Sequence, residues 1–302
     1  MAGIAAILLW SSVTGLARLV AESFGPVAGA AAMYSVASLF LLLVMGRPKW
    51  RQYSWRYVLI GGGLFIAYEI CLALALGMAN SRMQAIEMLV INYLWPALTV
   101  LMALLLSPKR ASWLVYPSIA LAFVGVAWSI TGDAGLSVSQ IAANVATNPA
   151  TYSMAFIGAF LWALYCNLTK TLARGQNAIT LFFILTAITL WIKAALFTEY
   201  SALPLSEVLT MESGAILLLA GVTMGAGYAL WNYAIIGGNM VFLATLSYFT
   251  PIIATVISSW LLGVAITHSF LQGVAMVTIG SLICWWVTRE KRKTPTLEEV
   301  NS

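Results

Sequence analysis

The chain has 302 residues, of which 62% are hydrophobic and only 8% are charged, with a formal net charge of +5. A soluble globular domain carries about 25% charged residues, because water must solvate its surface. The composition therefore excludes a soluble protein and predicts one whose surface is mostly covered by lipid. The basic residues sit in short loops and the tail, which does not resemble the basic face of a nucleic-acid-binding protein, and no nucleic-acid partner is expected.

Apolar segments follow one another along the chain, and each is close to the length of about 20 residues that crosses a bilayer. We expect an all-α integral membrane protein with ten transmembrane helices. The first segment begins almost at once, without a basic leader, and is interpreted as a span and not as a signal peptide. The expected spans are 3–22, 27–45, 57–79, 85–106, 112–130, 151–172, 178–198, 212–234, 240–262 and 269–287.

The distribution of lysine and arginine predicts that both termini are cytoplasmic. Cytoplasmic loops of membrane proteins carry an excess of these residues. With the N-terminus inside, only Arg18, Arg82 and Lys193 of the 15 basic residues fall in the outer half. The inner loops and the tail then hold Arg47, Lys49, Arg51, Arg56, Lys109, Arg110, Lys170, Arg174, Arg289, Lys291, Arg292 and Lys293.

Motifs of enzymes are missing from the sequence. The three cysteines, Cys71, Cys166 and Cys284, lie in apolar segments without metal-ligand spacing, and they are interpreted as packing residues. One histidine (His268) and one aspartate (Asp133) exclude an HExxH metalloprotease and a paired-aspartate protease. No GxxxxGK[ST] or GxSxG is present, which argues against an ATP-driven pump and a serine hydrolase. We expect a secondary transporter, without enzymatic activity or a cofactor.

The two sets of five spans resemble each other. Trp10 pairs with Trp162, and Pro96 pairs with Pro251. Since five is an odd number, the second set must enter the membrane from the opposite side, and such inverted repeats place a substrate site near the bilayer midplane. The predicted organisation is a first repeat over 1–130, an extracytoplasmic connection over 131–150, a second repeat over 151–288 and a basic cytoplasmic tail over 289–302. The similar stretches are 8–20 with 159–173, 68–77 with 228–237, and 91–106 with 246–262.

Three stretches carry a resemblance to a known family. They are QAIEMLVINYLWPALT (84–99), AFIGAFLWALYCNLTK (155–170) and GNMVFLATLSYFTP (238–251). Over essentially its whole length the chain resembles the drug/metabolite transporter superfamily, whose repeats are called EamA domains, and within it the exporters of amino acids. The resemblance implies export of aromatic and other neutral amino acids, such as Trp, Phe, Tyr, Met and Thr, across the bacterial inner membrane.

Pro96 and Pro251 are candidate hinges. Proline has no N–H, and its ring presses on the carbonyl four residues earlier, at Asn92 and Ser247 respectively. In a membrane the freed carbonyl needs a new partner, which can be water, a polar neighbour or a substrate ammonium. A tolerated helix kink without a role in transport is the alternative.

Aromatic and amide side chains at helical spacing are candidate substrate ligands. Asn92, Trp95 and Thr99 share one face of a helix, since they lie at i, i+3 and i+7. Aromatic walls with a few amides suit a zwitterion that has an apolar side chain. Packing or anchoring at the bilayer interfaces is the alternative role. The candidate substrate-binding residues are Trp10, Tyr68, Glu69, Asn92, Tyr93, Trp95, Trp162, Tyr165, Tyr228, Trp231, Asn232 and Tyr248.

Glu69 is the one acidic residue near the middle of a span. Charged groups in the membrane are costly and indicate function by default, so this carboxyl is expected to receive a substrate ammonium or carry a proton. A neutral structural carboxyl is the alternative. Arg18 and Glu22, at i and i+4, are expected to form an ion pair. Gly221 and Gly225 form a GxxxG pattern, which predicts close helix packing, with a face along which helices slide during alternating access as the alternative.

Other functions remain open. A channel would have the same composition but would conduct without saturation, and a receptor would not need inverted halves. A carrier of nucleotide sugars or quaternary ammonium compounds with the same fold is the main alternative to an amino-acid exporter. The expected mechanism is alternating access around a central cavity, with the substrate held by Asn92, Tyr93, Asn232 and freed backbone groups.

Overall fold

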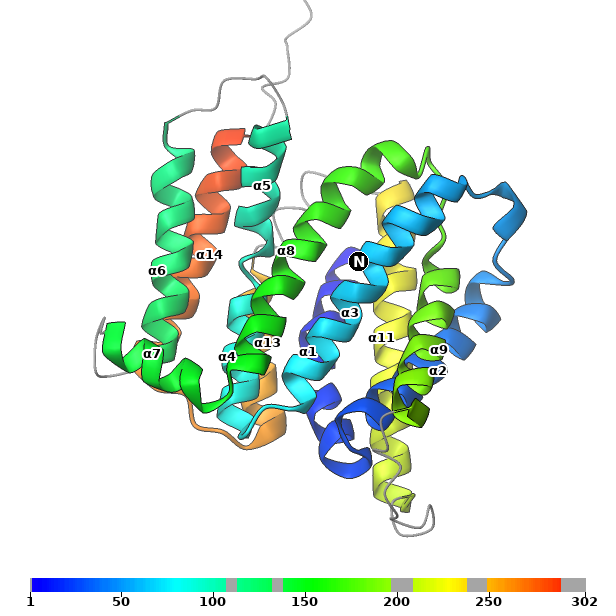
Figure 1. Cartoon of the computed structure of the whole chain (residues 1–302), viewed down its shortest axis with the longest axis horizontal. Coiled ribbons are helices and arrows are strands. Elements are labelled where there is room, and N and C mark those ends of the chain that lie inside the picture. Colours follow the sequence, from blue (N-terminus) through cyan, green and yellow to red (C-terminus); the bar gives the residue numbers. More distant parts are fainter. Residues whose placement is uncertain (1, 107–112, 132–137, 197–208, 238–248, 289–302) are drawn as a thin grey trace, which may run out of the picture.

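The computed structural model describes residues 2–106, 113–131, 138–196, 209–237 and 249–288, and this part of the chain is helical between short turns. Figure 1 shows the helices as one bundle. The helices are α1 (Ala2–Phe24), α2 (Pro26–Met45), η1 (Trp50–Gln52), η2 (Tyr57–Gly61), α3 (Gly62–Gly77), α4 (Arg82–Asn92), α5 (Trp95–Leu106), α6 (Val115–Thr131), α7 (Val138–Thr147), α8 (Pro149–Leu172), α9 (Ile179–Leu196), α11 (Met211–Gly237), α13 (Thr250–Leu262) and α14 (His268–Thr288).

Seven of the described helices are long and apolar enough to cross a membrane. Large apolar side chains such as Leu43 (78% exposed) and Trp260 (80% exposed) lie on the outside of the bundle, where only lipid would cover them. The protein is therefore an all-helical, multi-pass membrane protein. The seven candidate spans are Gly3–Phe24, Pro26–Met45, Tyr57–Gly77, Pro149–Leu168, Ile179–Leu196, Met211–Trp231 and His268–Val287.

The remaining expected spans look different. The segment 85–106, expected as one continuous helix, is divided into α4 and α5. The segment expected at 112–130 gives the shorter helix α6, and most of 240–249 lies outside the described residues. The connection 131–150 contains a helix that the sequence analysis did not predict, α7, whose 10 residues are too few to cross a bilayer.

Helices from the two halves of the chain interdigitate. The most extensive contacts join α6 with α14, α1 with α11, α2 with α9, and α3 with α8. In Figure 1, α5, α6 and α14 stand on one side, α2, α9 and α11 on the other, and α1, α3 and α8 lie between them. Neither half could therefore keep its main helix contacts without the other.

Glycines permit close approach at two helix contacts, that of α11 with α2 and that of α6 with α14. A Cβ at Gly221 would lie 2.5 Å from Val36 Cβ, and one at Gly225 would lie 3.1 Å from the carbonyl oxygen of Ala37. The close packing predicted from the GxxxG pattern is thus confirmed, and the partner is α2. A Cβ at Gly125 of α6 would lie only 2.6 Å from a carbonyl oxygen of α14, so these two backbones are in direct contact.

A cluster of charges joins four helices at one end of the bundle. Arg18 Nε lies 2.9 Å from Glu22 Oε1, which confirms the expected ion pair. Arg82, at the start of α4, also binds Glu22, with 2.7 Å between Nη2 and Oε2. Arg82 Nη1 donates to the carbonyl oxygen of Leu262 at the end of α13. Arg18 Nη1 donates to carbonyl oxygens at the end of α3 and to that of Ala79 just after it. We call these three charged residues the Glu22 cluster.

Candidate functional site

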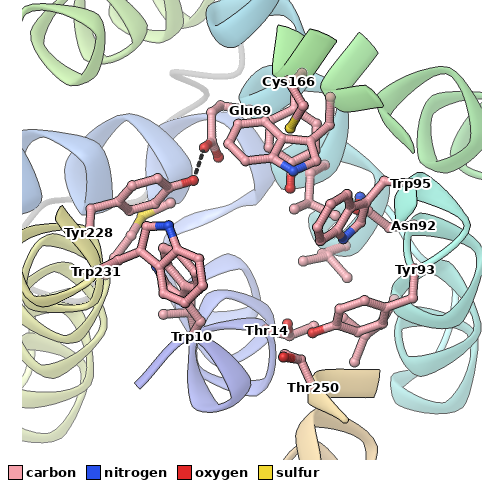
Figure 2. A pocket seen from close by; sticks show the side chains of 17 residues that line it. Trp10, Thr14, Glu69, Asn92, Tyr93, Trp95, Cys166, Tyr228, Trp231 and Thr250 are labelled. Carbon is pink, nitrogen blue, oxygen red and sulfur yellow. Dashed lines mark hydrogen bonds between the residues drawn. The ribbon is translucent and has the colours of Figure 1, made fainter. Parts of the chain in front are cut away.

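A cavity of about 250 Å³ lies among α1, α3, α4, α5, α8, α11 and α13, so both halves of the chain contribute to it (Figure 2). Its size suits one small molecule, and its walls are mostly apolar, as is usual for such sites. The lining residues are Trp10, Val13, Thr14, Tyr68, Glu69, Leu72, Leu76, Leu89, Asn92, Tyr93, Trp95, Trp162, Cys166, Met224, Tyr228, Trp231 and Thr250.

One wall of the cavity is an aromatic stack on α3 and α8. The ring of Trp162 lies between Tyr68, at a centroid distance of 4.6 Å, and Tyr165, at 5.0 Å. Trp95, the first residue of α5, meets Trp162 edge-on at 6.4 Å and 88°. Trp95 has no other ring contact among the described residues, so its indole is held less firmly than that of Trp162 and remains available to a ligand.

The opposite wall carries a second aromatic group. Trp10 of α1 lies 5.1 Å from Tyr228 and 5.0 Å from Trp231, both on α11. Gly227 makes this arrangement possible, because a Cβ there would lie 2.7 Å from Trp10 Cδ1. Figure 2 shows these rings facing Trp95 and Asn92 across the open space.

Glu69 places a carboxyl in this cavity, although the residue is only 1% exposed. The Tyr34 hydroxyl donates to Oε2 at 2.5 Å, and the Tyr228 hydroxyl donates to Oε1 at 2.7 Å. Three helices, α2, α3 and α11, thus meet at one carboxyl group. No lysine, arginine or histidine belongs to the described lining of the cavity.

The break between α4 and α5 also opens onto the cavity. α4 ends at Asn92, and Tyr93 and Leu94 form a turn before α5 begins. The Leu94 N–H bonds the carbonyl three residues before it, at 3.0 Å, which tightens the end of α4. Because Pro96 has no N–H, the Asn92 carbonyl lacks its usual helical donor. The Asn92 side chain is 4% exposed, and its Nδ2 has no hydrogen-bond partner among the described residues.

Most of the predicted ligands lie on this cavity. Tyr165 does not line it but packs behind Trp162. Asn232 lies in α11, but its side chain and the whole of Tyr248 lie outside the described residues. The cavity brings together Trp10, Tyr68, Glu69, Asn92, Tyr93, Trp95, Trp162, Tyr228 and Trp231.

Several residues that line the cavity were not predicted from the sequence, although helical spacing could have revealed them. Thr14 lies one turn after Trp10, and Cys166 lies one turn after Trp162. Selecting aromatic and amide residues left out such smaller neighbours. No group of three His, Cys, Asp or Glu residues that could hold a metal ion occurs in the described part of the chain. The other missed lining residues are Val13, Leu72, Leu76, Leu89, Met224 and Thr250.

Comparisons with known proteins agree with the sequence resemblance. The model of the EamA-like transporter family matches residues 150–286. The aromatic amino acid exporter YddG of Salmonella typhimurium is 45% identical over 289 residues, which cover 96% of this chain and 97% of the relative. The aromatic amino acid exporter YddG of Escherichia coli is 46% identical over 288 residues, covering 95% and 96%.

A solved structure described only as "Crystal structure of protein" shares the fold. It aligns with a TM-score of 0.62 and 21% identity, covering 93% of this chain and 94% of the other. The two relatives are similar along nearly their full lengths, and the alignments leave little of this chain unmatched. The chain therefore belongs to the EamA-like transporter family, within the drug/metabolite transporter superfamily.

Proposed function

We propose that this protein exports aromatic and other neutral amino acids, such as Trp, Phe, Tyr, Met and Thr, across the bacterial inner membrane by alternating access. The observation that carries the proposal is the cavity, in which indole and phenol rings surround one carboxyl and one amide. Flat apolar walls with a few polar groups match a small zwitterion with an aromatic side chain. The two YddG relatives are named as aromatic amino acid exporters, in agreement with this chemistry.

We propose a pseudo-twofold architecture of ten spans, as two inverted repeats over 1–130 and 151–288. The reciprocal pattern of helix contacts supports it. α1 packs on α11 as α8 packs on α3, and α1 packs on α13 as α8 packs on α5, while α2 meets α9 and α6 meets α14. In Figure 1, α1 and α8 run in opposite directions through the bundle. The distribution of Lys and Arg supports cytoplasmic termini, with 131–150 outside and 289–302 inside.

Pro96 and Pro251 are the proposed hinges. Both lie in the first turn of a helix, α5 and α13 respectively, and both helices contribute to the cavity. Proline is favourable in a first turn because its missing N–H would have no helical partner there. The backbone is interrupted beside the cavity between α4 and α5, where it can bend with little loss of hydrogen bonds, and this favours motion at Pro96.

A quaternary ammonium carrier is the second candidate, since Glu69 within an aromatic wall would also suit such a cation. A nucleotide sugar fits less well, because no basic side chain of the described lining could bind its phosphates.

The test is transport in proteoliposomes loaded with radiolabelled tryptophan, phenylalanine, methionine or threonine, with choline and protein-free liposomes as controls. The proposal expects saturable movement of the amino acids and none of choline. Non-saturable flux would indicate a channel, and choline transport alone would favour the second candidate. Repeating the measurement with a pH gradient separates proton antiport from facilitated diffusion.

A further inference from the structure

We infer that the cavity binds the two charged groups of an amino acid at separate, fixed places: the ammonium at Glu69, and the carboxylate at Asn92 and the start of α5. This inference rests on the proposed function and adds which residue binds the ammonium of the substrate and which binds its carboxylate. It assigns Glu69 and Asn92 as residues that determine specificity, and Tyr34 as a residue that positions Glu69.

Glu69 is a buried acid with no basic residue in the described lining of its cavity. A buried carboxylate is costly without a positive partner. The charged and titratable groups near it are the hydroxyls of Tyr34 on α2, Tyr228 on α11 and its neighbour Tyr68, and no described lining residue is basic. Two hydroxyl donors hold the carboxyl in place but supply no positive charge. A ligand with an ammonium group would supply it.

Asn92 lies on another wall of the cavity. A buried amide nitrogen without a partner carries a free-energy cost that a bound acceptor removes. Asn92 Nδ2 is in this state among the described residues, and the side chain lines the cavity. The same place is the break before α5, whose N-terminal end carries the positive end of a helix dipole. An amide donor beside the start of a broken membrane helix is suited to a substrate carboxylate.

The aromatic rings lie where the apolar side chain of the substrate would be placed. Figure 2 shows Glu69 and Asn92 at different edges of the open space, with the ring of Tyr228 beside Glu69 and that of Trp95 beside Asn92. Because the ammonium and the carboxylate of an amino acid are bonded to the same α-carbon, a substrate that contacts Glu69 and Asn92 would have its α-carbon between them and would direct its side chain against these rings. The arrangement therefore accounts for three features at once: a lone acid, a lone unpaired amide and aromatic walls.

Three ligands separate the two contacts: tryptophan has both charged groups, tryptamine lacks the carboxylate, and indole-3-propionate lacks the ammonium. Each is titrated against the purified protein in detergent, with ligand-induced thermal stabilisation as the readout, because a ligand stabilises the folded state according to its affinity. This measures binding without transport. Failure of wild-type proteoliposomes to transport tryptophan would refute the proposed function, whereas the ligand pattern tests the inference.

Glu69→Gln should weaken tryptophan and tryptamine at least about tenfold, the loss expected for a hydrogen bond to a charged group, and should change indole-3-propionate less than about twofold. Asn92→Leu should weaken tryptophan and indole-3-propionate but spare tryptamine. Tyr34→Phe, which alters no lining residue, should reproduce the Glu69→Gln pattern in a milder form, about threefold. Ser281→Ala on α14, another buried polar residue outside the cavity, is the matched control and should change none of the three.

Equal weakening of all three ligands by Glu69→Gln and by Tyr34→Phe would overturn the inference, because it would assign these residues to structure alone. Unchanged affinities in Glu69→Gln or in Asn92→Leu would overturn it as well, and so would the absence of stabilisation of the wild type by any ligand. If Glu69→Gln does not fold, the Tyr34→Phe pattern decides the ammonium contact.

Discussion

Replacing Trp95 with leucine should reduce the preference of the protein for aromatic over aliphatic substrates. Trp95 lines the cavity, and its only described ring contact is the edge-on one with Trp162. Leucine keeps an apolar surface but cannot form an aromatic pair with a substrate ring. Such a pair is worth about 0.5–1.5 kcal/mol beyond its buried area. At 1.4 kcal/mol per factor of ten, the preference should fall by about two- to twelvefold.

The assay compares the initial transport rates of tryptophan and methionine in the same proteoliposomes, at concentrations well below saturation. The ratio of the two rates is independent of how much protein folded and inserted. The control is Trp260→Leu on α13, since Trp260 is 80% exposed and does not line the cavity. An unchanged ratio in Trp95→Leu, with both rates lowered equally, would show that Trp95 supports packing and does not contact the substrate side chain.

Two further substitutions test the packing. Gly125→Ala should lower the free energy of unfolding by about 1–3 kcal/mol, because the new Cβ would meet the backbone of α14 at 2.6 Å. Gly63→Ala is the control: its Cβ would have no atom within 4 Å, so the change should be neutral or slightly stabilising. The thermal unfolding midpoints of the two variants in detergent measure the difference. Glu22→Gln should lower the free energy of unfolding by about 0.5–1.5 kcal/mol, since Arg18 and Arg82 both bind this carboxylate. Salt at about 1 M should destabilise Glu22→Gln less than the wild type, because the variant no longer has these ion pairs to screen. The control Glu212→Gln should respond to salt as the wild type does. If Glu22→Gln and the wild type respond identically, the ion pairs contribute nothing to stability.

The residues that line the cavity could be predicted from the sequence better than the hydrogen bonds between them. Aromatic and amide residues at helical spacing predicted Trp10, Asn92 and Trp162, because each helix has a fixed period. The bond from Tyr34 to Glu69 escaped prediction. It depends on how α2 and α3 rotate and dock, and helices that are apolar on all sides give no pattern from which to read that rotation.

The division of 85–106 into α4 and α5 was only partly predictable. Pro96 indicated a freed carbonyl at Asn92, but a kinked continuous helix and a full break satisfy the same local rule. The helix α7 was missed because the search used the length of a membrane span, which its 10 residues do not reach. The hinge roles of Pro96 and Pro251 remain predictions, and Tyr248 lies outside the described residues.

The backbone contact between α6 and α14 has a consequence for how the protein is made. α6 ends at Thr131, and its most extensive partner, α14, begins only at His268. At a synthesis rate of about 5–20 residues per second, roughly 7–27 s pass before that partner leaves the ribosome. During this time the face of α6 around Gly125 lies against lipid or a provisional neighbour. Assembly of the first half is therefore completed only when α14, the last helix of the described residues, has been made, and a chain truncated before α14 should leave this face of α6 without its partner.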